Sequence, residues 1–248
     1  MGWDISYHPI AVDEIQSIYF KGLEDKEYYK FLAKQFEVNG FYTEQMRIRF
    51  EEARNIDRAI PFNKGHAYYI AIISGFLRKY WYIRGGAFSF LTDDAGDAFI
   101  NYISDWKQLV PKSYQNFQFD NKLTENYCGG VFINNAALKH LRNDYQSNSY
   151  IHNKLNETFS GGRLNIFWEA VDYAINNNLG LLEASEIIEP NPLDLNSSKS
   201  LTNLFNCVPD GAILYAEASM QQLAEAMKSS KKESPPQKKS WISKLFGK

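Results

Sequence analysis

Histidines and clustered acids are the residues of this sequence whose types and spacing could do chemistry. The histidines stand at His8, His66, His140 and His152. No two of them have the i, i+4 spacing that places two ligands on one face of a helix, so the pattern does not support a metal site. His66 stands at the start of the buried helix expected at 65–83, where we interpret it as a capping or core residue rather than a catalyst.

The segment TDDAGDAF supplies the acidic cluster, with Asp93, Asp94 and Asp97 inside five residues. Carboxylate oxygens in such a group can hold a hard cation. The run lacks the ligand order of a calcium loop, however, and aspartates are also favourable at the start of a helix, near its free N–H groups. We therefore interpret the cluster as a helix start and predict neither a metal nor a cofactor.

The run EPNPLDLNSSKSLTNLFNC, rich in Pro, Asn, Ser and Asp, predicts a long loop. Long loops in compact domains often carry function. The polar residues of this loop are Asn191, Asp194, Asn196, Asn203 and Asn206. They could recognise a ligand or partner, but satisfaction of the loop's own backbone is the favoured interpretation. Apolar residues, Phe205 among them, predict that the loop packs down on the body.

An enzyme would need the polar groups to converge on one cleft. In that case the pattern predicts a pocket built from His66, Arg84, Asp93, Asp94 and the loop 191–206. No nucleophile elbow, phosphate-binding loop or dinucleotide fingerprint supports a particular reaction. An enzyme is therefore the alternative to a binding protein and not the first hypothesis.

The composition predicts a packed body that is acidic overall. Of the 248 residues, 44% are hydrophobic and 15% aromatic, which is enough for a sizeable core. Residues 228–248 contain seven lysines and one glutamate, so this end carries +6 and the rest of the chain −8. An acidic body argues against nucleic-acid binding, which needs clustered Lys and Arg, and it suits a basic protein partner.

Cysteine usage and the apolar segments predict a cytoplasmic protein. Cys128 and Cys207 are isolated, without the spacing of a disulfide framework or a zinc site. The N-terminus lacks the pattern of a signal peptide. The most apolar segment, 68–83, is interrupted by Arg78 and Lys79 and is too short to cross a bilayer.

The last residues predict a flexible linker, 228–240, followed by a short amphipathic tail, 241–248. Pro235 and Pro236 lie in a Lys- and Ser-rich stretch that cannot fold by itself. The residues expected to make contacts are Lys238, Lys239, Trp241, Ile242, Lys244, Leu245 and Phe246. We give equal weight to two roles for this tail: weak peripheral contact with an anionic membrane, and docking on a protein surface. Either role suits a segment in which apolar and cationic groups stand side by side.

Hydrophobic periodicity predicts a body, 1–227, dominated by helices. Helices are expected at 12–36, 41–56, 134–145, 151–159, 163–178 and 212–228, with a buried one at 65–83 and another from 97 to Pro111. Phe41 is expected to face inward. Strands are expected at 5–10, where Pro9 indicates a sheet edge, at 87–91 and at 129–133, while GLLEASEIIE fits either type. The predicted fold class is α+β, predominantly α-helical with two or three short strands, forming a single compact domain plus a disordered C-terminal tail.

Three segments carry a resemblance to a known type of protein. MGWDISYHPI, GFLRKYWYIRGGAFSFL and GLLEASEIIEPNPLDLNSS resemble segments of uncharacterised bacterial proteins of similar length, which are similar in character to the immunity proteins that bacteria keep against interbacterial toxins. The resemblance implies a cytoplasmic, acidic protein that neutralises one cognate toxin by occluding its active site. Under this interpretation the tail holds the protein near the inner face of the membrane. A peripheral membrane adaptor, with the tail as its main element, is the third hypothesis.

Overall fold

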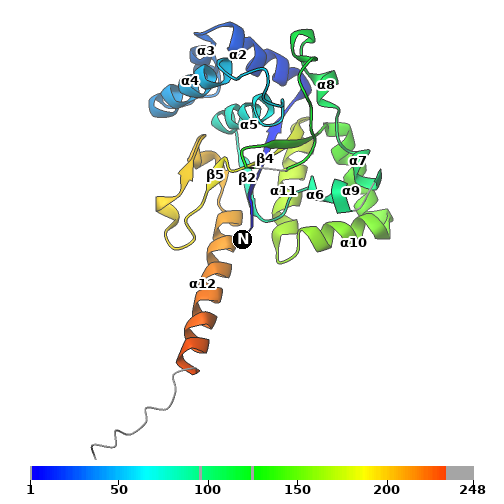
Figure 1. The fold of residues 1–248 in the computed structure, drawn as a ribbon, viewed down its shortest axis with the longest axis vertical. Coiled ribbons are helices and arrows are strands. Elements are labelled where there is room, and N and C mark those ends of the chain that lie inside the picture. The colour runs from blue at the N-terminus through cyan, green and yellow to red at the C-terminus, as the bar shows by residue number, and fades with distance from the viewer. Residues whose placement is uncertain (1, 95–96, 124–125, 233–248) are drawn as a thin grey trace, which may run out of the picture.

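A mixed five-stranded sheet forms the centre of the molecule, with helices on both faces (Figure 1). The computed structural model describes residues 2–94, 97–123 and 126–232. In spatial order the strands are β3 (Gly129–Ile133), β4 (Gly180–Ser185), β1 (Asp4–Ile10), β2 (Tyr80–Arg84) and β7 (Cys207–Val208). Neighbouring strands are antiparallel except β2 and β7, which are parallel. A separate two-stranded ribbon joins β5 (Ile188–Glu189) to β6 (Lys199–Ser200).

Strand β1 lies in the middle of the sheet, which corrects the expectation that Pro9 marks an edge. Pro9 is opposite Leu181 of β4, but the pairing of β1 with β2 runs only from Asp4 to Tyr7. Proline cannot donate to a ladder. It is tolerated here because it stands beyond the part of β1 that has neighbours on both sides.

One face of the sheet is covered by α5 (His66–Leu77), and α4 (Gly40–Arg54) packs on α5. Helix α5 is apolar around its whole circumference, as expected for a helix enclosed on every side. The side chain of Asn39 accepts the N–H of Tyr42 and so caps α4. The smaller elements before α4 are α1 (Val12–Glu14), the π-helical turn η1 (Ile15–Phe20), α2 (Lys21–Glu24) and α3 (Tyr28–Gln35).

The other face is covered by α11 (Arg163–Asn176), which packs on β1, β2 and β4. Helices α9 (Asn135–Ser147) and α10 (Ser149–Thr158) complete this layer. The short helices are α6 (Phe90–Asp94), α7 (Asp97–Ile100), α8 (Trp106–Leu109) and η2 (Lys112–Tyr114). The sheet separates two cores: Leu182 belongs to the one under α5, and the adjacent Leu181 belongs to the one under α11. This alternation is the two-residue period of a strand buried on both faces.

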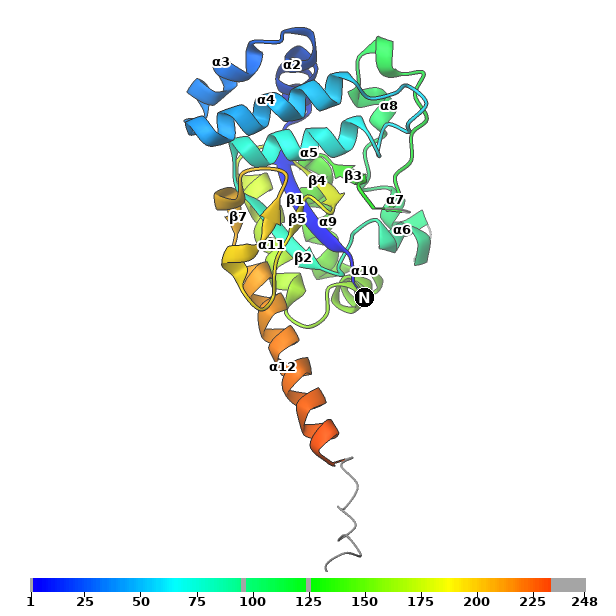
Figure 2. The ribbon, with the colours of Figure 1, turned by 60° about the vertical axis from the view of Figure 1, so that its left-hand side comes forward.

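The last helix, α12 (Asp210–Lys232), starts against the sheet and then leaves the body. Its first turn approaches the backbone of Tyr82 in β2 so closely that no side chain would fit at Gly211. Leu214 and Tyr215 still pack on the body, whereas residues 220–228 are all exposed where the helix projects away from the rest of the molecule, as both views show (Figure 2). The loop that precedes it contains η3 (Leu195–Ser197) and η4 (Leu204–Asn206).

The predicted fold class, a predominantly helical α+β domain with two or three short strands, was wrong. Helices hold 56% of the residues and strands 13%, but the strands build a five-stranded mixed sheet with helices on both sides and a second, two-stranded sheet. The predicted helix 65–83 ends at Leu77, and its last residues form β2. A strand buried on both faces shows no polar alternation, so its sequence continues the apolar run of the helix. The predicted C-terminal tail, 241–248, lies outside the described residues.

Candidate functional site

His66 lies in an aromatic part of the core under α5. Its Nδ1 atom is 2.6 Å from the Tyr19 hydroxyl oxygen, and the rings of Phe62, Tyr114 and Phe117 surround the imidazole. Burial lowers the pKa of His66 to about 4, so the ring is neutral at pH 7. His66 is therefore a core residue whose Nδ1 atom has a hydrogen-bond partner inside the protein.

Arg84 stands at the far end of β2 and forms an ion pair with Asp4, at 2.5 Å between Nη1 and Oδ1. The same carboxylate accepts the hydroxyl of Tyr82, and the Arg84 guanidinium lies 4.9 Å from the centre of the Tyr215 ring. Asp4 is almost fully buried, so the arginine neutralises a carboxylate that would be costly to bury alone.

The groups predicted for an enzyme pocket are therefore not gathered in one described cavity. Arg84 lines two pockets, and His66 is absent from the described residues that line either of them. Asp93 and Asp94 close α6, and their side chains lie outside the described part of the structure. From the loop 191–206, Asn191 does reach one Arg84 pocket, together with Asp4 and Tyr215.

The polar residues of the loop 191–206 mainly support backbone groups. The Asn191 side chain accepts the N–H groups of Leu193 and Asp194, and Asp194 in turn accepts the N–H of Asn196. Asn203 accepts the N–H of Phe205 in the same way. Such side-chain turns organise a segment that lacks regular structure.

Two further contacts fasten the loop to the end of α5. Asn206 donates its side-chain amide to the carbonyls of Gly75 and Phe76, and the Thr202 hydroxyl donates to the carbonyl of Ile72 at 2.7 Å. Carbonyls at a helix end lack partners within the helix. Asn206 supplies partners for two such carbonyls, Gly75 and Phe76, and together with Thr202 it fixes the position of the loop on α5.

The loop residue Phe205 nevertheless points outward, with 84% of its surface exposed. Next to it, Phe41 at the start of α4 is 67% exposed, which corrects the expectation that it faces inward. The buried ring of Tyr42 joins the two, at 5.1 Å from Phe41 and 6.1 Å from Phe205 between ring centres. We call Phe41, Tyr42 and Phe205 the aromatic surface. A pocket of about 240 Å³, lined by Phe41, Tyr42 and polar atoms of Ser198 and Ser200, opens beside it.

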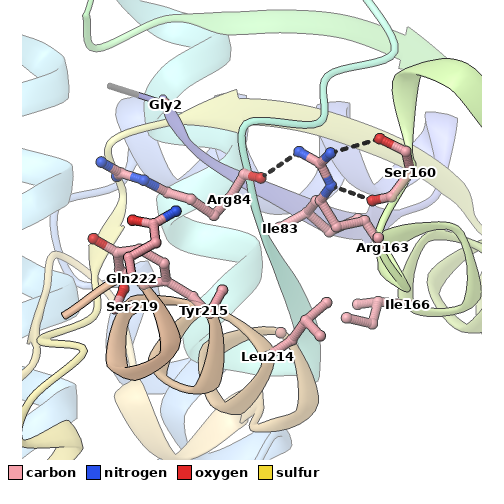
Figure 3. A pocket seen from close by; sticks show the side chains of 13 residues that line it. Gly2, Ile83, Arg84, Ser160, Arg163, Ile166, Leu214, Tyr215, Ser219 and Gln222 are labelled. Atoms are coloured by element: carbon pink, nitrogen blue, oxygen red, sulfur yellow. Dashed lines mark hydrogen bonds between the residues drawn. The ribbon is translucent and has the colours of Figure 1, made fainter. Parts of the chain in front are cut away.

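A pocket of about 640 Å³ lies between the end of β2, the turn 160–163 and α12 (Figure 3). It contains two cationic side chains, Arg84 and Arg163, and no carboxylate among its described lining residues. Arg163 donates to the carbonyls of Ser160 and Arg84, at 2.6 and 3.0 Å, and to the Ser160 hydroxyl. Both guanidinium groups are thus engaged within the protein, so we assign them to holding this corner of the fold together.

Sequence reasoning missed a buried polar centre at Glu183 in β4. This carboxylate accepts the hydroxyl of Tyr7 at 2.9 Å and the N–H groups of Phe88 and Ser89. Burial raises the pKa of Glu183, while the hydrogen bonds it accepts act in the opposite direction. The contacts also explain why 87–91, predicted as a strand, instead forms a turn into α6. The only sequence signal was a single acid inside the apolar run GLLEAS.

Searches for familiar sites and relatives add no further assignment. Within residues 2–94, 97–123 and 126–232, no three His, Cys, Asp or Glu side chains are arranged to hold a metal ion. Among those same residues, each helix is too short or too polar to traverse a bilayer. No family model, curated protein or solved structure matches the chain.

Proposed function

We propose that this protein binds a basic protein partner and blocks it by occlusion, as an immunity protein blocks a toxin. The observation that carries the proposal is the aromatic surface. Phe41 and Phe205 come from distant parts of the chain and are brought together by the docking of a long loop on α5, yet their rings face solvent.

The energetics of protein association support this role for the aromatic surface. Aromatic side chains carry much of the binding energy where they enter a partner's pocket. Their position on ordered backbone matters as well, because little conformational entropy is then lost on binding. Phe205 follows a side-chain cap at Asn203, and Phe41 lies in the first turn of a capped helix. Both anchors are therefore pre-organised.

Charge supports the choice of partner. The chain carries −8 outside residues 228–248, so long-range attraction favours a basic protein and raises the rate of encounter. A membrane adaptor, the other binding role, depends on residues 233–248, which lie outside the described structure.

The test begins with the full chain used to capture proteins from its native cell, followed by affinity measurement on the purified captured protein. The double variant Phe41→Ala/Phe205→Ala should weaken binding about 30-fold or more, equivalent to about 2 kcal/mol for the loss of two anchors. Circular dichroism should show that the variant is folded.

The matched control is Phe31→Ala, because Phe31 is an exposed phenylalanine of α3 that lies outside the aromatic surface. Its affinity should equal that of the unaltered chain, and association should slow as salt is added. Unchanged affinity of the double variant would contradict the proposal, as would the absence of any basic protein among those captured.

A further inference from the structure

Helix α12 carries an apolar stripe on the part that leaves the body. The stripe consists of Ile213, Ala216, Met220, Leu223 and Met227, so its steps alternate between three and four residues. The central residues Met220 and Leu223 are 53% and 46% exposed. A repeat that averages 3.5 residues is the pattern of positions a and d in a coiled coil, which keeps one seam facing another helix.

Among the residues that the structure describes, the body leaves Met220, Leu223 and Met227 of this stripe exposed, whereas Ala216, closer to the body, is half-buried. The side of α12 that faces the large pocket carries Leu214, Tyr215, Ala218 and Gln222, which belong to different positions of the repeat (Figure 3). Residues 221–228 are all exposed. A helix that extends into solvent gains little stability from propensity alone, and most helical stability in proteins comes from packing an apolar face. A second helix lying along the stripe would supply that packing.

The charges along α12 point to a second copy of the same helix, lying antiparallel. Between Asp210 and Met227 the helix contains three acids and no Lys or Arg, whereas Lys228, Lys231 and Lys232 follow at its end. An antiparallel pair places the cationic end of each helix beside the acidic start of the other. An anionic membrane fits the stripe poorly, because the acids flanking it would be repelled.

We propose that two copies of the chain associate through antiparallel pairing of their α12 stripes. In the register that aligns positions a with d, Met220 of one copy lies against Leu223 of the other, and Ala216 lies against Met227. The outer layers then combine small Ala216 with large Met227, and the central layers combine Met220 and Leu223, which are similar in volume.

The geometry of the body allows this arrangement. Because α12 projects from the rest of the molecule, an antiparallel partner places the two bodies at opposite ends of the helix pair (Figure 2). The contact has about four apolar layers, so it falls near the lower limit of specific interfaces, on the order of 1,000 Å². Association should therefore be reversible and visible at concentrations on the order of 10 to 100 μM.

Sedimentation of the full chain over that concentration range tests the association. We expect the average mass to rise toward twice that of one chain, and the variant Met220→Glu to sediment as one chain throughout. The control is Gln221→Glu, which adds the same charge to an exposed neighbour off the stripe and should associate normally. Circular dichroism establishes that both variants keep their helices. A single-chain mass for the unaltered protein at every concentration overturns the proposal.

Cysteine cross-linking tests the direction of the pair. Mixing the variants Ala216→Cys and Met227→Cys should give a disulfide-linked pair containing one of each, while either variant alone should cross-link poorly. In the antiparallel register two copies of position 216 are separated by about 16 Å along the axis, given a rise of 1.5 Å per residue. Efficient cross-linking of each variant with itself would show a parallel pair and overturn the proposed arrangement. Binding to vesicles would also overturn the proposal. If the unaltered chain sediments with anionic phosphatidylserine vesicles and Met220→Glu does not, the stripe binds a lipid surface and not a second helix.

Discussion

Glu183 and Phe205 are each placed against the usual preference of their residue type. The carboxylate of Glu183 is inside the protein, and the ring of Phe205 is almost entirely outside it. The buried acid is fully accounted for, because Tyr7 and two backbone N–H groups hold it. Among the described residues, the ring of Phe205 has no comparable set of contacts. Its neighbour Tyr42 covers one side, and the rest of the ring faces solvent.

This difference separates residues that hold the fold from residues that are available for function. A buried polar group with internal partners contributes to structure, and it leaves little chemistry for a ligand. A rigidly mounted exposed aromatic costs hydrophobic free energy in the isolated protein, and that cost is recovered when a partner covers it. By this criterion the aromatic surface is a better site than the polar groups that sequence patterns suggested.

Among the polar groups, the largest effect should come from removing the buried acid. Glu183→Ala leaves the N–H of Ser89 without its acceptor, whereas the N–H of Phe88 and the hydroxyl of Tyr7 keep only their second acceptors, Tyr7 and Gly86, at 3.1 Å. The lost hydrogen bonds and the cavity together should lower the free energy of unfolding by about 3–5 kcal/mol. Urea unfolding followed by circular dichroism measures the change. Glu189→Ala, which alters an exposed glutamate, is the control and should cost less than about 0.5 kcal/mol. A loss below about 1 kcal/mol for Glu183→Ala would contradict the structural role assigned to it.

A smaller effect should appear on acidification, through His66. Its pKa is about 4 in the folded protein and about 6.5 when unfolded, so below pH 6.5 the unfolded chain binds the proton first. Stability is therefore lost as the pH falls from 6.5 toward 4, by about 2 kcal/mol at pH 5 for this one group. The check is the free energy of unfolding of the unaltered chain and of His66→Gln, measured from pH 7.5 to 5. Over this range the unaltered chain should lose about 2 kcal/mol more than the variant.

Tyr19→Phe separates burial of His66 from its hydrogen bond. The variant removes the hydroxyl that contacts Nδ1 but leaves the imidazole buried, and burial is the cause of the lowered pKa. The pH slope should persist, while stability at neutral pH falls by about 1 kcal/mol. Loss of the slope in Tyr19→Phe would show that the hydrogen bond, and not desolvation, keeps His66 neutral.

The smallest effect on stability should come from the aromatic surface itself. Phe205→Ala should change the free energy of unfolding by less than about 0.5 kcal/mol, because the ring buries little area. Phe76→Ala removes the same side chain from the core under α5 and should cost about 3–5 kcal/mol. Thermal or urea unfolding of the two variants measures this difference between an exposed and a buried phenylalanine. A large loss of stability in Phe205→Ala would show that Phe205 supports the fold.

Much of the helical framework was predictable because its signals are local. The expected helices at 41–56, 134–145 and 163–178 are confirmed as α4, α9 and α11, and the expected strand 129–133 is β3. Each helix has an apolar face at the 3.6-residue period, and α4 and α9 have an asparagine cap. The expected helix from residue 97 to Pro111 is instead divided into α7 and α8, with the N–H of Ser104 bound to the carbonyl of Phe132 in β3. That contact joins residues far apart in sequence.

The sequence by itself determined the acidic body, the cationic end and the helices with a clear periodic face. Charge is a sum over residues, and helical amphipathicity depends on neighbours three and four positions away. Tertiary structure decided the central place of β1, the strand at Tyr80–Arg84, the separation of His66 from Arg84 and the exposure of Phe41 and Phe205. These features depend on which distant segments meet, because the burial of a strand on both faces and the exposure of an aromatic ring are set by packing partners that no local pattern specifies.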